Sequence, residues 1–154
     1  MGPEAVHERF MRRALACAET ALREGDDPVG AVLVRDSTIL AEGRNRVRSS
    51  RDITAHAEVD AIRRALAGSH RGPTDATLYT TEEPCPMCLW MALRAGISAV
   101  VIGARYADMP DENVGGYSVE ALLALTGRTL AITDDVLRAQ CLAMHDRGVL
   151  PEMG

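Results

Sequence analysis

Two cysteines three positions apart follow a proline in the segment TTEEPCPMCLW, residues 80–90. At this spacing Cys85 and Cys88 would lie on one side of the first turn of a helix, with Pro86 at its first position. Free N–H groups at a helix start lower the pKa of a thiol and favour the thiolate. Thiolates serve both disulfide exchange and metal binding. The pair therefore indicates a redox site, half of a structural zinc site, or half of a catalytic one.

A histidine and a glutamate open a second predicted helix, in the segment ITAHAEVDA, residues 53–61. If the strands before the two helices are parallel and side by side, the helix starts meet and His56 converges with Cys85 and Cys88. One imidazole and two thiolates leave one tetrahedral position open, which is typical of catalytic zinc, whereas structural zinc takes a fourth protein ligand. Four residues are candidates for that fourth ligand: Cys17, His70, Cys141 and His145. We expect these two cysteines in apolar helical stripes and these two histidines in solvent beyond helix ends.

Glu58 has a chemical role beside such a metal. Zinc held by one neutral imidazole and two thiolates carries no net formal charge, so it acidifies bound water less than a three-histidine site would. A neighbouring base must help, and general acid–base catalysis contributes about 10²–10⁴-fold in rate. Without the three nearby ligand residues, Glu58 would be interpreted as a carboxylate in the first turn of a helix, where it interacts favourably with the helix dipole.

The rest of the chain reads as strands and helices in alternation. Helices are expected over residues 4–23 and 55–68, from about residue 85, near residues 118–125 and from about residue 134. A hairpin is expected over residues 30–45 with its turn at residues 35–37, and strands at residues 76–81, 98–104 and 128–133. Residues 105–117 read as an irregular loop. This order predicts a single α/β domain over residues 1–154, with three α/β/α layers around a mixed five-stranded sheet.

Composition excludes several functions. The net charge of −5 disfavours a general polyanion binder. The chain has no lysine, which rules out Schiff-base chemistry, pyridoxal phosphate anchoring and a P-loop of the Walker type. Its four cysteines do not form a secreted disulfide framework, and neither a signal peptide nor a long apolar run appears. We expect a cytoplasmic protein with no membrane segment.

The motifs H-A-E and P-C-P-M-C resemble those of the zinc-dependent cytidine deaminase superfamily. The chain is most similar to the branch that contains guanine deaminases, cytosine deaminases and tRNA adenosine deaminases, from DPVGAVLV to the final helix. The resemblance implies one zinc per subunit on His56, Cys85 and Cys88, with Glu58 as the proton shuttle. It implies that an activated water attacks an amino-bearing ring carbon and releases ammonia. It also implies that Asn45 hydrogen-bonds the substrate, and that the protein is a homodimer.

Departures from these relatives bear on the substrate. Relatives often place Gly-Ala where this chain has Trp90-Met91, and these two side chains either fill a gap in the core or reshape the pocket. The final helix of tRNA-editing members is usually basic, whereas four acids face two arginines here: Asp134, Asp135, Asp146 and Glu152 against Arg138 and Arg147. The loop acids Asp108, Asp111 and Glu112 would also repel a phosphate backbone and could receive exocyclic amino or ring N–H donors of a neutral base, with Asp108 as the candidate substrate contact. Arg44, Arg46, Arg48 and Arg51 could hold a nucleotide phosphate or an RNA strand, but we expect a solvated loop or an interface that pairs them with the surplus acids.

The sequence thus predicts a hydrolytic deaminase of a small free nucleobase or related amino-heterocycle, with guanine and cytosine as leading candidates. Nucleic acid is the less favoured partner. The first alternative is a tRNA-specific adenosine deaminase. From other classes come a thiol-disulfide oxidoreductase that uses Cys85 and Cys88, and a non-catalytic binding module that zinc stabilises.

Overall fold

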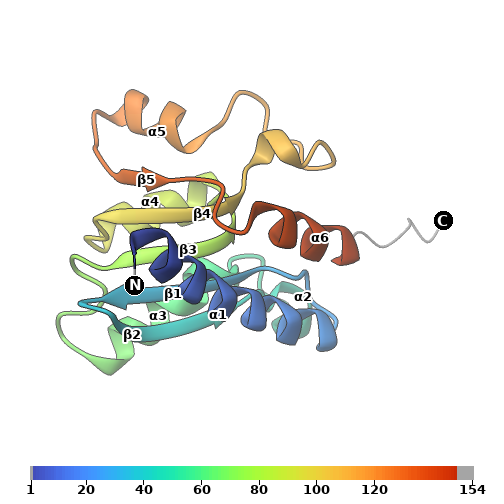
Figure 1. The fold of residues 1–154 in the computed structure, drawn as a ribbon, viewed down its shortest axis with the longest axis horizontal. Coiled ribbons are helices and arrows are strands. Elements are labelled where there is room, and N and C mark those ends of the chain that lie inside the picture. Colours follow the sequence, from blue (N-terminus) through green and yellow to red (C-terminus); the bar gives the residue numbers. More distant parts are fainter. Residues whose placement is uncertain (1, 149–154) are drawn as a thin grey trace.

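A mixed five-stranded sheet forms the centre of the computed structural model, which describes residues 2–148. Glu152 of the acidic tail lies outside these residues. The strands are ordered β2-β1-β3-β4-β5 across the sheet (Figure 1). Their bounds are Gly30–Arg35 for β1, Thr38–Arg44 for β2, Thr77–Glu82 for β3, Ala99–Ala104 for β4 and Ala131–Thr133 for β5. β1 is antiparallel to both β2 and β3, whereas β3, β4 and β5 are parallel. The predicted mixed sheet is confirmed.

The prediction that the strands before the two ligand-bearing helices lie side by side is wrong. The strands before the two ligand-bearing helices are not neighbours, because β1 lies between β2 and β3. Both strands are antiparallel to β1, so they still point the same way. The helices that follow them therefore start at the same end of the sheet, where β3 and β4 also finish (Figure 1).

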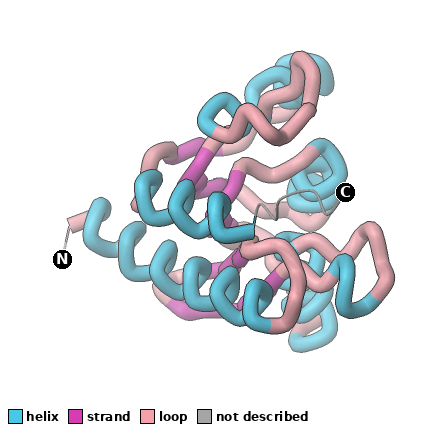
Figure 2. Tube along the Cα trace, turned by 90° about the vertical axis from the view of Figure 1, so that its right-hand side faces the viewer, coloured by secondary structure: helices cyan, strands magenta, loops and turns pink. Residues whose placement is uncertain are grey.

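Helices cover both faces of the sheet and give the expected three layers (Figure 2). α1 (Pro3–Arg23) and α6 (Arg138–Gly148) cover one face, where an apolar cluster includes Phe10, Met11 and Cys141. α3 (Ala57–Gly68) and α4 (Pro86–Arg94) cover the other face, where the cluster includes Ile62 and Leu89. α5 (Val119–Thr126) packs beside α4. Burial of these apolar stripes on both sides is the main stabilising term of such a fold.

The chain departs from the expected elements in three places. The closing helix begins at residue 138, four residues later than expected, because Asp135 and Leu137 have positive φ values of 59° and 53° that a right-handed helix cannot contain. A short helix, α2 (Val47–Ser50), and a 3₁₀ turn, η1 (Tyr106–Asp108), lie in segments that were read as loops. β5 starts three residues later than expected. No helix of residues 2–148 is long and apolar enough to span a bilayer.

Gly43 in β2 sets how closely α3 can approach the sheet. A Cβ atom at this position would lie 2.4 Å from the carbonyl oxygen of Ala57 and 2.4 Å from the amide nitrogen of Ala61. Both are backbone atoms in α3, so the helix itself would have to move. We expect Gly43→Ala to lower the free energy of unfolding by about 1–3 kcal/mol, measured by urea denaturation. Gly68→Ala, where a Cβ would meet nothing within 4 Å, is the control; equal effects of the two changes would contradict the prediction.

Candidate active site

The structure brings His56, Cys85 and Cys88 together. His56 is the N-cap residue of α3 and Cys85 is the N-cap residue of α4, with Pro86 at the first helical position as expected. His56 Nδ1 lies 3.5 Å from Cys85 Sγ and 3.5 Å from Cys88 Sγ. Cys88 is fully buried, whereas the other two are partly accessible. One imidazole nitrogen and two sulfurs therefore meet at two helix starts.

This donor set fits zinc. The three ligand atoms all lie within 4.8 Å of one another, and within residues 2–148 no fourth histidine, cysteine or carboxylate joins the group. Thiolate and imidazole ligands favour zinc among the common divalent ions. Three ligands and an open fourth position match a catalytic site better than a structural one.

The pKa values of the two thiols are shifted in opposite directions. A hydrogen bond from Cys88, together with His56, lowers the pKa of Cys85 to about 4. The same bond and burial raise the pKa of Cys88. The hydrogen bond with Cys85 raises the pKa of His56. Both cysteines are free, so the structure contains no disulfide between them. One thiolate is thus present before any metal binds, and metal binding must displace the proton of the second.

Glu58 lies in the first turn of α3 and is 3% exposed. Thr80 Oγ1 is 2.7 Å from Glu58 Oε1 and 2.7 Å from the carbonyl oxygen of Glu82. A hydroxyl carries one hydrogen and a carbonyl only accepts, so both contacts are hydrogen bonds when a protonated Glu58 donates to Thr80. Burial raises the pKa of Glu58 and so favours this protonated form. An ionised Glu58 would accept from Thr80 instead, so Thr80 can hold the carboxyl group in both states.

A cavity of about 540 Å³ opens over these residues. Its size is typical of small-molecule sites. Among residues 2–148, six carboxyl groups line it: Asp27, Glu58, Glu82, Glu83, Asp111 and Glu112. Arg48 is the one arginine of the lining in this part of the chain, and its guanidinium lies 3.1 Å from Asp27. The cavity therefore has an acidic wall that favours cationic groups and N–H donors over phosphates.

Asn45 lines the cavity and is 6% exposed. Its Oδ1 accepts from the backbone N–H of Val47 at 3.0 Å, which holds the amide in place at the start of α2. Asp108, the other candidate substrate contact, is not part of the cavity lining. Its carboxyl group accepts from the backbone N–H of Arg105 and pairs with Arg138. The position of Asp108 gives it a structural role in this fold, and its substrate contact stays a prediction.

His145 was expected in solvent, and this expectation is wrong. It lies inside α6, is 7% exposed, and lines the cavity between two carboxyl groups. Its Nδ1 is 3.1 Å from Glu82 Oε2, and its Nε2 is 2.8 Å from Asp111 Oδ2. Both ring nitrogens face acceptors, so the doubly protonated imidazolium satisfies both contacts. His70 is exposed, whereas Cys141 is buried in the core as expected.

This arrangement predicts a dependence of stability on pH. The hydrogen bond with Glu82 is the main cause that raises the pKa of His145 to about 9 from an ordinary value of 6.5. A raised folded-state pKa stabilises the protein fully below pH 6.5, and this contribution is lost as the pH rises through 9. We expect His145→Gln to lower the free energy of unfolding by about 3 kcal/mol at pH 6 and by little at pH 10. Urea denaturation at both pH values measures the difference; an equal loss at both would contradict it.

The arginine-rich stretch pairs with acids of the same chain. Arg44 contacts Glu24 at 3.1 Å, and Arg46 contacts Asp60 at 3.3 Å. With Arg48 held by Asp27, three of the four arginines are already neutralised in the folded chain. A phosphate would have to displace these carboxylates to bind here.

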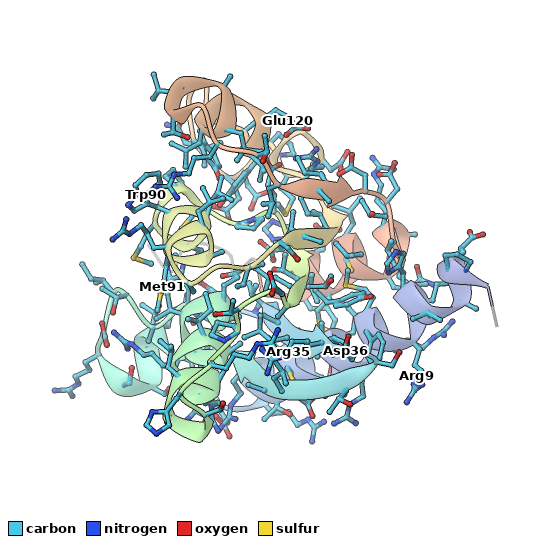
Figure 3. The ribbon with its side chains drawn as sticks, turned by 90° about the vertical axis from the view of Figure 1, so that its left-hand side faces the viewer. Arg9, Arg35, Asp36, Trp90, Met91 and Glu120 are labelled. Carbon is cyan, nitrogen blue, oxygen red and sulfur yellow. The ribbon has the colours of Figure 1, made fainter. Side chains whose placement is uncertain are left out.

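Trp90 and Met91 both lie on α4 (Figure 3). Trp90 is 40% exposed, with the guanidinium of Arg128 4.8 Å from its ring centre. It therefore does not fill a gap in the core, and neither side chain lines the cavity within the described residues. Met91 is half-buried and packs against the core.

Two of the loop acids named from the sequence, Asp111 and Glu112, line the cavity. Several other residues of the cavity wall were not predicted as such: Asp27, Glu82, Tyr106 and His145. Two signals could have indicated part of this set. Glu82 and Glu83 are adjacent acids at the end of a buried strand, where charge is unusual. His145 follows Cys141 by four residues in a helix, which places both on one face.

Comparisons with known proteins agree with this site. Residues 4–104 match the model of the cytidine and deoxycytidylate deaminase zinc-binding region. Over 105 residues the chain is 46% identical to the guanine deaminase of Bacillus subtilis, a match that covers 66% of this chain and 67% of that protein. Over 133 residues it is 35% identical to a tRNA-specific adenosine deaminase of Buchnera aphidicola, covering 86% of this chain and 81% of that protein.

A solved structure from work on A-to-I editing by tRNA:A34 deaminases at the wobble position of transfer RNA is also similar. It aligns with a TM-score of 0.76 and 31% identity, over 88% of this chain and 98% of that one. Other matched relatives are much longer than the aligned segment. The chain spans 8% of a chloroplastic tRNA(adenine(34)) deaminase of Arabidopsis thaliana and 16% of a tRNA(Ile)-lysidine synthase of Deinococcus radiodurans.

Proposed function

The chain belongs to the cytidine and deoxycytidylate deaminase family of zinc-dependent hydrolytic deaminases, and we propose that it deaminates a small amino-heterocycle, with guanine and cytosine as leading candidates. One observation carries this proposal. The group formed by His56, Cys85 and Cys88 lies at an acidic cavity together with the buried Glu58. The similarity to a guanine deaminase supports guanine as the first compound to test.

Zinc bound by His56, Cys85 and Cys88 would supply a Lewis acid that makes a water molecule acidic near neutral pH. Glu58 would take a proton from the attacking water and deliver it to the departing amino nitrogen. The reaction breaks the bond between the ring carbon and its exocyclic amino nitrogen, forms a C–O bond to the water oxygen and releases ammonia, with both protons of the water passing to the product and the leaving group. Thr80 supports this role because it can bond the carboxyl group of Glu58 before and after the proton moves.

Asn45 would orient the substrate. Its Oδ1 is held by the N–H of Val47, so its amide nitrogen is left to donate to a ring nitrogen or carbonyl group. Its burial at the cavity wall fixes the direction of this donor. An amide in a fixed position contributes orientation, which lowers the entropy cost of reaction.

A second candidate function is deamination of adenosine in tRNA. The match to a tRNA-specific adenosine deaminase over 86% of this chain favours it. Charge opposes it, because Arg44, Arg46 and Arg48 are paired with carboxylates and the cavity wall is acidic. Binding of RNA depends on neutralising phosphates with free cations.

Ammonia release by the zinc-loaded protein distinguishes these candidates. The panel contains guanine, cytosine, adenine, their nucleosides and nucleotides, triazines, and a tRNA anticodon stem-loop. We expect turnover of free bases and none of the stem-loop. Turnover confined to the stem-loop, with binding that weakens steeply as salt rises, would favour the tRNA candidate. No turnover of any compound would overturn the proposal.

The thiol-disulfide alternative has less support. Residues 4–104, which match a zinc-binding region, include both Cys85 and Cys88. An oxidoreductase would need these thiols free of metal in its working form. Reduction of insulin disulfides by the metal-free protein tests this alternative, and we expect none.

Three further features are part of the proposal. We propose one catalytic domain over residues 1–154, which forms a homodimer in the cytoplasm. Met87 and Trp90 on α4 and Leu66 on α3 are exposed apolar side chains of the kind that interfaces bury. Free cysteines fit a reducing compartment. Analytical ultracentrifugation of the whole chain tests the dimer.

A further inference from the structure

The wall of the cavity contains a row of three charged groups that the proposed chemistry does not use. Glu82 ends β3, His145 lies in α6, and Asp111 lies in the loop after η1. The imidazole stands between the two carboxylates, 3.1 Å from Glu82 Oε2 and 2.8 Å from Asp111 Oδ2. Three segments far apart in the sequence thus meet at one face of the cavity, and all three residues line it.

The two carboxyl groups of this row differ in their contacts, because both oxygens of Asp111 lie near His145 Nε2 whereas only one oxygen of Glu82 contacts the imidazole. Glu82 Oε2 is engaged by His145, whereas no described residue supplies a partner to Oε1 of the same carboxyl group. Within residues 2–148 no fully buried side-chain oxygen or nitrogen lacks a partner. Because Glu82 lines the cavity and its unpaired Oε1 is therefore not among the fully buried atoms, this oxygen can accept from a molecule bound there.

The row is acidic, since two carboxyl groups flank one imidazole and Glu112 adds a further carboxyl group to the same wall. Burial raises the pKa of Glu82, whereas the hydrogen bond with His145 opposes this shift and favours the carboxylate. The carbonyl oxygen of Glu82 bonds Thr80, which also contacts Glu58, so Glu82 is one hydrogen-bonded residue away from the proposed proton shuttle. Glu58 and Glu82 also line the same cavity, so a heterocycle with its reacting amino group at Glu58 would have another edge available to Glu82.

We propose that Glu82 determines substrate specificity by accepting a hydrogen bond from a second exocyclic amino group of the heterocycle, with His145 as the residue that positions it. This inference rests on the proposed function and extends its substrate class beyond guanine and cytosine, which each have one exocyclic amino group, to diamino-heterocycles such as a purine with amino groups at both C2 and C6. Asp111 holds the far side of His145. A charge-assisted hydrogen bond of this kind favours the diamino compound about ten- to a hundredfold.

The pair of compounds for the test is 2,6-diaminopurine and adenine, which differ only in the amino group at C2. Binding is measured by calorimetry on the zinc-loaded protein in a Glu58→Gln background, so that no turnover occurs. We expect 2,6-diaminopurine to bind at least about tenfold more tightly than adenine. Adding Glu82→Gln is expected to reduce this advantage to about threefold or less, because the carboxylate charge is lost.

Glu82→Gln would also reduce the advantage of 2,6-diaminopurine if it loosened α6, and Glu19→Gln is the control for this effect. Glu19 pairs with Arg147 and so ties α6 to α1, outside the cavity. We expect this control to keep the full advantage of 2,6-diaminopurine. Melting temperatures are recorded for every variant. Equal binding of the two purines by the starting protein, or an advantage that survives Glu82→Gln, would overturn the inference.

The two proposals fail separately. Ammonia release from a free base together with an advantage that does not depend on Glu82 would leave the proposed function in place and remove the inference. Binding that prefers 2,6-diaminopurine and depends on Glu82, without ammonia release from any compound, would leave the inference in place and remove the proposed function. His145→Asn is the second variant if Glu82→Gln does not fold, because it keeps the carboxyl group of Glu82 and removes the imidazole that positions it. We expect this variant to reduce the binding advantage of 2,6-diaminopurine over adenine at least threefold. An unchanged advantage would overturn the inference.

Discussion

Glu58→Gln is expected to reduce kcat by about 10²–10⁴-fold on whichever base the wild-type enzyme deaminates. Glutamine has nearly the same shape and can still bond Thr80, which lies 2.7 Å from Glu58 Oε1. An amide cannot take a proton from water or return it to the leaving nitrogen. The loss should therefore appear in kcat, while KM changes less than tenfold.

Zinc content separates this effect from damage to the metal site. Glu58 is not among the three residues grouped as metal ligands, so the variant should keep one zinc ion per chain. The matched control is Glu42→Gln, which changes a carboxylate that bonds Cys17 and Arg13 far from the cavity. We expect wild-type kcat for this control. A Glu58→Gln enzyme within threefold of wild type would rule out the proton-shuttle role.

Cys88→Ala is expected to remove the metal and with it all measurable turnover. Cys88 is fully buried, and its Sγ lies 3.5 Å from Nδ1 of His56. Neither water nor a described side chain nearby supplies the thiolate that this substitution removes. Atomic absorption after dialysis should give about one zinc per wild-type chain and less than about a tenth for the variant. Wild type should also lose about 4 kcal/mol of stability when the free zinc concentration falls from a thousandfold above Kd to none.

Cys17→Ala is the matched cysteine control. Cys17 is half-buried and free, and its thiol donates to Glu42 outside the metal group. The control should keep its zinc and its activity. Stoichiometric zinc in Cys88→Ala, or loss of zinc from Cys17→Ala, would show that a different set of residues holds the metal.

Local patterns in the sequence were enough to place the metal group. Cys85, Pro86 and Cys88 predict a helix start, because a proline is accepted at the first position and residues three apart share a face. His56 opens its own helix for similar local reasons. Spacing and residue type thus indicated the donors and the neighbouring acid. Their convergence depended on a predicted arrangement of two strands, which was right in direction and wrong in making the strands neighbours.

The topology was only partly accessible from the same patterns. Alternation of strands and helices predicted an α/β fold with helices on both faces, which the structure confirms. It did not reveal that β1 lies between β2 and β3, because strand order depends on which sheet edge each hairpin joins. The start of α6 was also misplaced, since the left-handed conformations of Asp135 and Leu137 leave no clear mark on residue type.

The sequence alone determined the chemistry that the site can perform, because ligand type and spacing are local properties of helix starts. Tertiary structure alone decided what surrounds that chemistry. Glu82, Asp111 and His145 are separated by up to 63 residues, and only the docking of α6 and the loop after η1 brings them to one wall. No local sequence pattern distinguishes a histidine in solvent from a histidine that is buried between two carboxyl groups. Burial and long-range pairing distinguish them, and these arise only when the whole chain packs.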